Sequence, residues 1–114
     1  MPEPETRGPL QLRVKVWLER GEDVVLSEYR ARLLEAIALH GSVTAAAAEL
    51  RLPVRTAWKK LREMEGAAGV PLVESGSGGS AGGGSTLTPE AEAMVMAFRR
   101  LTGPVRSAAE RGFA

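Results

Sequence analysis

Apolar and polar positions alternate along a nine-residue stretch near the start of the chain. The apolar members of this stretch are Leu10, Leu12, Val14, Val16 and Leu18. Side chains of a strand point to opposite faces in turn, so this period of two predicts a half-buried β-strand. A turn at residues 19–22 and a second apolar run then predict a return strand, and we expect a β-hairpin over residues 10–26.

Apolar residues then recur at spacings of three and four, which predicts three helices. The first begins after Ser27, a candidate N-cap, and ends at Gly41, a residue suited to the left-handed conformation. Thr44 is the candidate cap of the second helix, which runs to about Arg51 through four consecutive alanines. The third helix follows Pro53 and is expected over residues 54–65. One apolar face of this third helix carries Val54, Ala57, Trp58, Leu61 and Met64.

Two short extended segments around a glycine-rich tip are expected next. They span residues 72–88, with the tip at residues 76–85, and predict a β-hairpin. Thr88 and Pro89 then begin a helix, expected over residues 89–114 with a break or kink at Gly103 and Pro104. The residues that this helix is expected to bury are Ala91, Met94, Val95, Phe98 and Leu101.

Together these elements predict a mainly α protein with a small β content. Three helices with tight turns between them form a helix-turn-helix arrangement. A β-hairpin that follows such helices is called a wing. We therefore expect a winged helix-turn-helix domain over residues 27–88, with a β-hairpin before it and a long helix after it.

Composition narrows the chemistry that the chain can perform. The 114 residues include no cysteine and one histidine, His40, and the formal net charge is +1. A thiolate metal site and a cysteine nucleophile are excluded, and His40 is expected to cap or pack at a helix end. No paired acid and base stand out, so we expect neither an enzyme nor a bound cofactor or metal.

The ends of the chain carry no targeting signal that the sequence reveals. Residues 1–9 contain three prolines and two glutamates, which predicts a disordered tail. No run of eighteen apolar residues occurs. We expect a cytoplasmic protein that is neither exported nor embedded in a membrane.

Basic residues gather on the predicted third helix. Arg55, Lys59 and Arg62 follow one another at spacings of four and three, so they share one helical face. The major groove of B-DNA admits one α-helix, and arginine or lysine can contact phosphates and guanine edges there. The alternative is an ordinary solvated face. The helix-turn-helix arrangement favours DNA binding.

The glycine-rich tract allows three interpretations. It can be a flexible linker, a nest of backbone N–H groups that holds an oxyanion, or the tip of a wing that approaches DNA. The lack of a closing Gly-Lys-Ser/Thr argues against a phosphate-binding P-loop. The wing residues that we expect near DNA are Ser77, Gly78, Gly79, Ser80, Gly82 and Gly83.

Several motifs in a fixed order resemble a known family. They are Gly41-Ser42-Val43-Thr44, Ala57-Trp58, Leu72-Val73-Glu74, the glycine block at residues 78–84, and Leu87-Thr88. Over roughly residues 10–102 the chain resembles the N-terminal DNA-binding domain of the ModE family, bacterial molybdate-responsive transcription regulators. LysR-type regulators share the looser winged pattern.

The resemblance implies a homodimer that binds a two-fold related operator in double-stranded DNA. Residues 54–65 would enter the major groove, and the glycine-rich hairpin would be the wing. Family members usually carry Ser-Tyr-Lys where this chain has Pro53-Val54-Arg55, so two hydroxyls are lost and one basic residue is kept. Relatives bind molybdate in separate C-terminal domains. Because this sequence ends at Ala114, we expect it to lack them and not to bind molybdate in that manner.

These observations lead to one main hypothesis and two alternatives. The main hypothesis is a sequence-specific DNA-binding transcription regulator, whose signal can come from a separate effector or partner protein. The expected DNA contacts are Ser42, Thr44, Arg55, Thr56, Lys59, Lys60 and Arg62. The expected dimer contacts are Trp17, Met94, Val95, Phe98 and Leu101. The alternatives are a winged-helix protein-interaction module that does not bind DNA, and a small oxyanion-binding protein.

Overall fold

The computed structural model describes residues 7–76 and 84–114. The elements in chain order are β1 (Trp17–Arg20), β2 (Asp23–Ser27), α1 (Glu28–His40), α2 (Val43–Glu49), α3 (Val54–Ala68), β3 (Val73–Ser75), β4 (Ser85–Leu87) and α4 (Pro89–Phe113). Strands β1 and β2 pair antiparallel, and so do β3 and β4. The predicted fold, a winged helix-turn-helix preceded by a β-hairpin and followed by a long helix, is confirmed.

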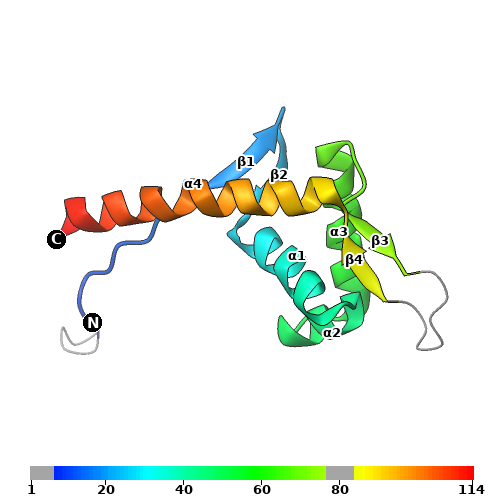
Figure 1. Cartoon of the computed structure of the whole chain (residues 1–114). Coiled ribbons are helices and arrows are strands. Elements are labelled where there is room, and N and C mark those ends of the chain that lie inside the picture. Colours follow the sequence, from blue (N-terminus) through cyan, green and yellow to red (C-terminus); the bar gives the residue numbers. More distant parts are fainter. Residues whose placement is uncertain (1–6, 77–83) are drawn as a thin grey trace.

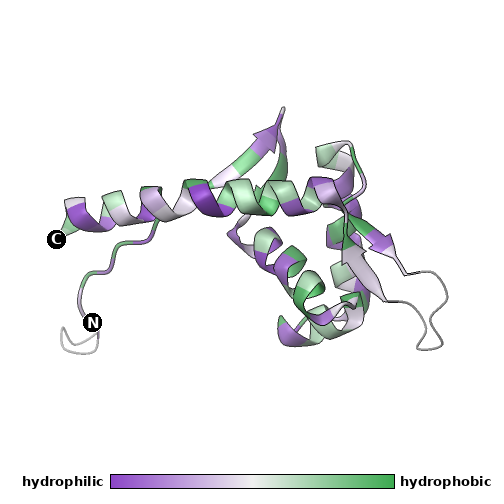
Figure 2. Cartoon of the chain, viewed as in Figure 1, coloured by the Kyte–Doolittle hydropathy of each residue, from purple (hydrophilic) through white to green (hydrophobic). Residues whose placement is uncertain are grey.

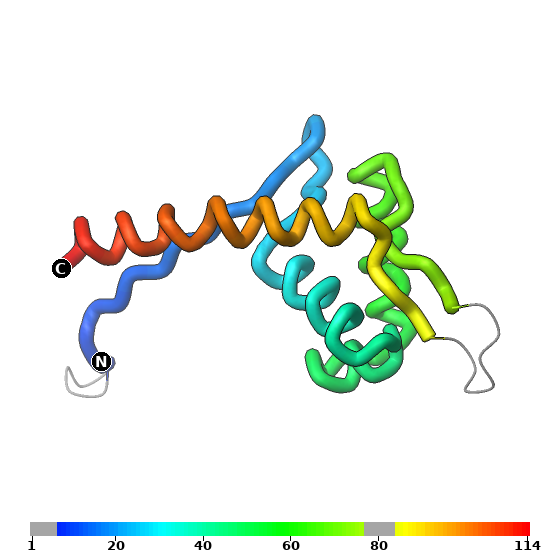
Figure 3. The backbone as a smooth tube through the Cα atoms, in the orientation of Figure 1, coloured from blue at the N-terminus to red at the C-terminus, as the bar shows by residue number. Residues whose placement is uncertain are grey.

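The helices form a small body from which one helix extends (Figure 1). Helix α4 passes over α1, α2 lies below α1, α3 stands upright beside the beginning of α4, and the β3–β4 hairpin leaves the body at the side opposite to the free end of α4. The smooth trace in Figure 3 shows that roughly half of α4 continues beyond the other helices. The principal extents of 57 × 29 × 25 Å follow from this extension.

A single apolar core joins the helices and the first hairpin. Its largest fully buried side chains are Leu26, Leu33, Leu34, Ile37, Leu61, Met64, Leu72 and Phe98. Small residues fill the remaining space, because Ala46, Ala47 and Ala57 are also fully buried and allow α2 to approach its neighbours closely. Figure 2 shows hydrophobic and hydrophilic residues alternating along the helices, as expected of elements with one packed and one exposed face.

The ends of α1 agree with the sequence prediction. The Ser27 side chain accepts a hydrogen bond from the Arg30 backbone N–H, and Gly41 is left-handed with φ 68°. Helix α2 differs, because its N-cap is Ser42, whose hydroxyl accepts from the Ala45 N–H at 3.1 Å. The prediction of Thr44 as the cap was wrong, since Thr44 already lies in the first helical turn. Helix α3 runs three residues beyond the expected end and stops before the left-handed Gly69.

The first hairpin is shorter than expected. The structure has strands only from Trp17 to Ser27, so the prediction of a hairpin over residues 10–26 is corrected. Residues 10–16 are not in a strand, and no other described residue forms a backbone hydrogen bond with them. A strand needs a ladder partner, and β2 passes into α1 after Ser27, where that partner would have to continue.

Helix α4 continues through Pro104, so the expected break at residues 103–104 is corrected. Gly103 and Pro104 are both exposed, and the carbonyl group that loses its donor to the proline can be hydrated instead. The buried stripe also differs from the prediction. Leu101 is 48% exposed, and Thr102 takes the expected place of Leu101 in the core.

The wing is confirmed as an element, with Val73 opposite Leu87 and Ser75 opposite Ser85. Ser77, Gly78, Gly79, Ser80, Gly82 and Gly83 lie outside the described residues, as does most of the predicted tail at residues 1–9. None of the helices in the described part has both the length and the apolar content needed to cross a membrane.

Candidate nucleic-acid interface

Helix α3 has one buried and one exposed face. Ala57, Leu61 and Met64 are buried at spacings of four and three, and they hold the helix against the core. Arg55, Lys59 and Arg62, spaced in the same way but shifted by two positions, are all exposed. A shift of two positions corresponds to about 200° around a helix. The three cations therefore point away from the core, as the sequence predicts.

The two other DNA contacts that we expected on α3 lie closer to the body. Lys60 is half-buried, and its Nζ lies 5.2 Å from the centre of the Tyr29 ring on α1. Thr56 is half-buried at the beginning of α3. The structure therefore separates Lys60, which is engaged in a cation–π contact, from the exposed row of Arg55, Lys59 and Arg62.

The beginning of α3 leaves backbone donors free. Its N-cap, Pro53, makes no side-chain cap hydrogen bond, and the first intrahelical donor is the Ala57 N–H, 3.1 Å from the Pro53 carbonyl. The N–H groups before Ala57 thus lack a partner among the described residues. Free N–H groups and the helix dipole attract anions such as phosphate.

Arg51, in the turn between α2 and α3, was not among the expected contacts. It is the only non-glycine residue with positive φ in the described part of the chain, at 57°, and it is exposed. This conformation costs an L-residue about 1–2 kcal/mol. The sequence places Arg51 in the basic run before α3, but it gives no sign of the left-handed backbone.

Ser42 and Thr44 lie at the start of α2. The Ser42 hydroxyl is used as the N-cap, so it is not a free donor, whereas Thr44 is exposed. The α1–α2 turn also holds the wing, because the Ser85 N–H donates to the Gly41 carbonyl at 2.8 Å. Thr44 and the base of the wing are therefore attached to the same turn.

The base of the wing requires close approach of two backbones. A Cβ on Gly76 would lie 3.0 Å from the carbonyl oxygen of Gly84, so any side chain there would require the Gly84 backbone to shift by a few tenths of an ångström. Glu65, at the other end of the wing connection, accepts from the backbone N–H groups of Leu72 at 2.8 Å and of Val73 at 3.3 Å. Sequence reasoning missed this role of Glu65, because no local pattern links a helical carboxylate to a strand seven residues later.

Helix α4 is fixed to α1 by a charged cluster. Arg99 donates to both carboxylate oxygens of Glu35, at 2.7 and 2.8 Å, and to Glu28 at 2.7 Å. The hydrogen bonds to Glu35 and Glu28 raise the pKa of Arg99, and the hydrogen bond from Arg99 lowers the pKa of Glu28. Arg106 adds a second pair with Glu28 at 3.8 Å. These contacts connect the helix that leaves the body to the first helix of the winged helix-turn-helix domain.

Other candidate residues have structural surroundings. His40 contacts the Glu49 carboxylate across the α1–α2 turn, and Trp58 packs against the core. Over residues 7–76 and 84–114 no group of three potential metal ligands is found. Trp17 is 51% exposed and donates to the Glu19 carboxylate at 2.7 Å.

The dimer contacts that we expected on α4 divide into two groups. Val95 and Phe98 are only 7% and 1% exposed and belong to the core of this chain, so their assignment to a dimer surface is corrected. Met94 is half-buried and Leu101 is exposed. These two remain available to a second chain, together with Trp17.

Comparisons with known proteins agree on the class of domain. The family model of bacterial regulatory helix-turn-helix proteins of the lysR family matches residues 30–92. The molybdenum-pterin-binding protein MopA of Rhodobacter capsulatus is 39% identical over 79 residues, which is 69% of this chain and 30% of MopA. The molybdenum transport protein ModE of Azotobacter vinelandii is 37% identical over 94 residues, 82% of this chain and 35% of that protein. The chain thus spans about a third of the length of these relatives.

A solved structure shares the fold. The crystal structure of a CbnR_DBD–DNA complex matches with a TM-score of 0.58 and 23% identity, covering 72% of this chain and 88% of the other. At this identity the likeness concerns the arrangement of helices and wing. The region matched by the family model includes α2, α3 and the exposed basic face described above.

Proposed function

The chain belongs to the bacterial regulatory helix-turn-helix proteins of the LysR type, and from this premise we propose that it binds double-stranded DNA as a homodimer and regulates transcription. The observation that carries the proposal is the exposed row of Arg55, Lys59 and Arg62, which lies opposite the packed face of α3. A helix with one packed face and one cationic face fits the major groove.

The neighbouring elements support the same mode of binding. The free N–H groups at the start of α3 and the exposed Thr44 can donate to backbone phosphates, which position a protein without reading bases. Arg55 stands near the beginning of α3, where recognition helices contact base edges. The base of the wing is held at the α1–α2 turn, next to Thr44, by the hydrogen bond from the Ser85 N–H to the Gly41 carbonyl. We assign base contact to Arg55 and phosphate contact to Lys59 and Arg62.

The homodimer part of the proposal rests on a second apolar stripe of α4. The members of this stripe follow one another at spacings of three and four: Met94, Ala97, Leu101, Val105 and Ala108. Met94 is partly covered by the core of this chain, whereas Ala97 and Ala108 are exposed and Leu101 and Val105 are 48% and 38% exposed, so the stripe beyond Met94 is not covered by the chain itself. Such spacing forms the seam of a two-helix packing. Two copies joined along it would present two α3 helices to successive turns of the duplex, about 34–36 Å apart.

The relatives add a regulatory context to the proposal. MopA and ModE carry names that refer to molybdenum, and we propose that the genes regulated by this chain concern the same element. We do not expect residues 1–114 to bind molybdate directly. Calorimetry with molybdate, tungstate and sulfate would show heat at micromolar concentration if that expectation were wrong.

Duplex binding is tested by fluorescence anisotropy with a labelled DNA fragment. The Arg55→Ala variant should bind its preferred site about 1–3 kcal/mol more weakly and should discriminate less at one base pair, if Arg55 contacts a guanine. A protein-interaction module would instead show no duplex binding, or weak binding that Arg55→Ala leaves unchanged. Near-neutral net charge makes that alternative worth including.

The dimer is tested by light scattering or sedimentation of two matched variants. Leu101→Glu puts a charge into the seam and should shift the protein towards monomer. Arg100→Glu changes charge on an exposed residue outside the seam and should leave the mass unchanged. If the two variants have the same mass in solution, the proposal that Leu101 lies in the dimer interface is wrong.

A further inference from the structure

The segment of residues 10–16, which we call the N-terminal arm, presents a mismatch between sequence and structure. Its alternating pattern is the strongest strand pattern in the chain, yet the segment is not in a strand and has no ladder partner among the described residues. Leu10 and Leu12 are 89% and 37% exposed, so the apolar face of the arm is also partly uncovered. The backbone N–H and C=O groups of the arm thus lack ladder hydrogen bonds, and part of its apolar face lacks a packing partner.

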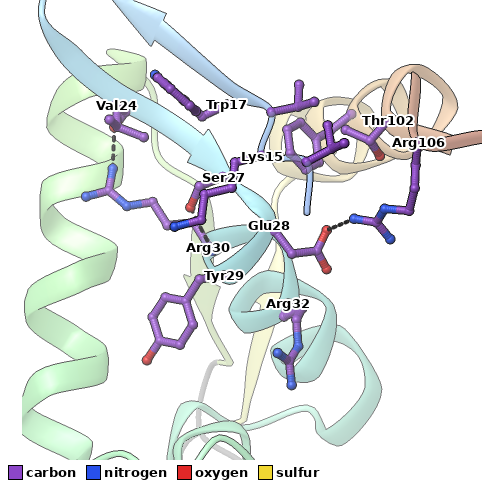
Figure 4. Close-up of a pocket in the computed structure, with 13 residues that line it drawn as sticks. Lys15, Trp17, Val24, Ser27, Glu28, Tyr29, Arg30, Arg32, Thr102 and Arg106 are labelled. Atoms are coloured by element: carbon purple, nitrogen blue, oxygen red, sulfur yellow. Dashed lines mark hydrogen bonds and ion pairs between the residues drawn. The ribbon is translucent and has the colours of Figure 1, made fainter. Parts of the chain in front are cut away.

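The arm lies beside the far half of α4. Leu12, Arg13 and Val14 line a shallow pocket together with Arg106 and Glu110. The following residues of the arm border a larger pocket, about 570 Å³, between the arm, the start of α1 and α4 (Figure 4). The close-up shows Lys15 and Trp17 on one side of this pocket, and the Arg106–Glu28 pair on the other. The arm is therefore next to the part of α4 that carries the exposed seam.

This position makes a second copy of the chain a suitable partner for the free backbone edge of the arm. A second copy that packs along the α4 seam brings its own α4, and with it its own arm, to the same side of the molecule. A two-fold axis relates equal segments in antiparallel directions, and two antiparallel strands can share one ladder. The second copy thus supplies a strand of the required direction without any further partner.

Charge selects the register of such a pair. Apolar residues of one arm must lie opposite apolar residues of the other, and they occupy every second position. The two-fold axis therefore has to pass at a residue that opposes its own copy, and not between two residues. Centring on Arg13 places that arginine opposite itself, and centring on Val14 places Arg13 opposite Lys15. Like charges in direct opposition destabilise a strand pair. Centring on Leu12 places Gln11 opposite Arg13, an uncharged acceptor opposite a cation.

We propose that the N-terminal arm becomes a β-strand in the homodimer, by antiparallel pairing with the arm of a second copy across an axis at Leu12. The inference rests on the homodimer of the proposed function and adds to it a defined interface and register. It also accounts for the strand pattern that begins at Leu10, although the strand within one chain begins only at Trp17.

The absence of cysteine from the sequence allows a direct test by cross-linking. Directly opposed Cα atoms in a ladder lie about 4.5–5.5 Å apart, within the range of about 4.4–6.8 Å that a disulfide spans. Leu12→Cys should therefore form a disulfide-linked dimer under mild oxidation. In this register the two Arg13→Cys thiols are diagonal neighbours, with Cα atoms about 7–8 Å apart, so that variant should link at least about tenfold more slowly.

A mixed sample tests the register independently. Gln11→Cys and Arg13→Cys, each slow alone, should link to one another when co-expressed, because these two positions oppose one another. Leu39→Cys, on an exposed residue of α1, is a control for random collision. Mass measurement of the unmodified protein accompanies these experiments.

The outcomes separate the two proposals. Rapid linking of Leu12→Cys and of the Gln11→Cys with Arg13→Cys mixture supports the arm pairing. A dimeric protein in which Leu12→Cys links no faster than Leu39→Cys or Arg13→Cys overturns the arm pairing and leaves the α4 seam in place. A protein that is monomeric at tens of micromolar overturns the homodimer, and the arm pairing with it.

Discussion

The adjacent residues Lys59 and Lys60 provide the sharpest test of the proposed DNA interface. Both are lysines on α3, so replacing either by alanine removes the same charge from the chain. Lys59 is exposed in the row with Arg55 and Arg62, whereas Lys60 lies over the Tyr29 ring. We expect Lys59→Ala to change the salt dependence of duplex binding and Lys60→Ala to leave it unchanged.

The expected size follows from the number of cations that we assign to phosphates. Lys59 and Arg62 give two per chain and four in a homodimer, and if each neutralises one phosphate, the slope of log K against log[salt] is about −3.6. The affinity should then fall about 10²-fold between 50 and 200 mM salt. Lys59→Ala removes two of the four contacts and should make the slope less steep by about 2.

The assay is anisotropy of one labelled duplex at five or more salt concentrations, with both variants checked for unchanged thermal unfolding. The wild-type protein and Lys60→Ala should give parallel lines, and Lys59→Ala a flatter one. Equal slopes for the two variants, or flattening by Lys60→Ala alone, would refute the argument that exposure on α3 decides which cations meet the DNA.

Three further predictions concern stability, each measured by urea unfolding. Ser42→Ala removes the α2 cap and should lower the free energy of unfolding by about 1 kcal/mol, whereas Thr44→Ala should change it by less than about 0.5 kcal/mol; the reverse order would contradict the cap assignment. Arg51→Gly should raise the free energy of unfolding by about 0.5–1 kcal/mol, because relief of the left-handed strain exceeds the added conformational entropy of the unfolded chain. A lower free energy of unfolding would instead mean that the arginine side chain stabilises the turn. Arg99→Met should lower it by about 1–2 kcal/mol, a figure reduced for the partial exposure of the cluster. Arg99 lowers the pKa of Glu28, so their pairing stabilises the fold fully above the ordinary carboxyl pKa of about 4.3. This stabilisation is lost as the pH falls through the lowered pKa of Glu28. In Arg99→Met the free energy of unfolding should therefore decline less steeply below about pH 5 than in the wild-type protein.

Local signals in the sequence predicted most of the fold. Ser27 and Gly41 bound α1 because a hydroxyl cap and a left-handed glycine act within one or two residues of a helix end. Thr88 and Pro89 begin α4 for the same kind of reason. The exposed face of α3 also followed from spacing alone, because the apolar residues of that helix decide which side is packed.

The predictions that were wrong concern residues whose burial or pairing depends on a segment far away in the sequence. The arm pattern predicts a strand, but pattern does not say whether a partner strand is present in the same chain. Thr102 is buried where we expected Leu101, because the way in which α4 packs on α1 decides which stripe of α4 is covered. Lys60 was grouped with Lys59, since only the position of Tyr29 on another helix distinguishes them.

The connection between α1 and α4 links the dimer to the recognition helix. The spacing of two α3 helices is useful for DNA only if each is held rigidly relative to the two-fold axis, and that axis lies at α4 in our proposal. Phe98 is buried in the core, and its neighbour Arg99 binds two carboxylates of α1, so α4 is attached by both packing and charge. Helix α1 in turn packs on α2 and α3. A change at the Arg99 cluster should therefore weaken binding to a two-half-site duplex more than binding to an isolated half-site, although no residue of the cluster lies on the α3 face proposed to meet DNA.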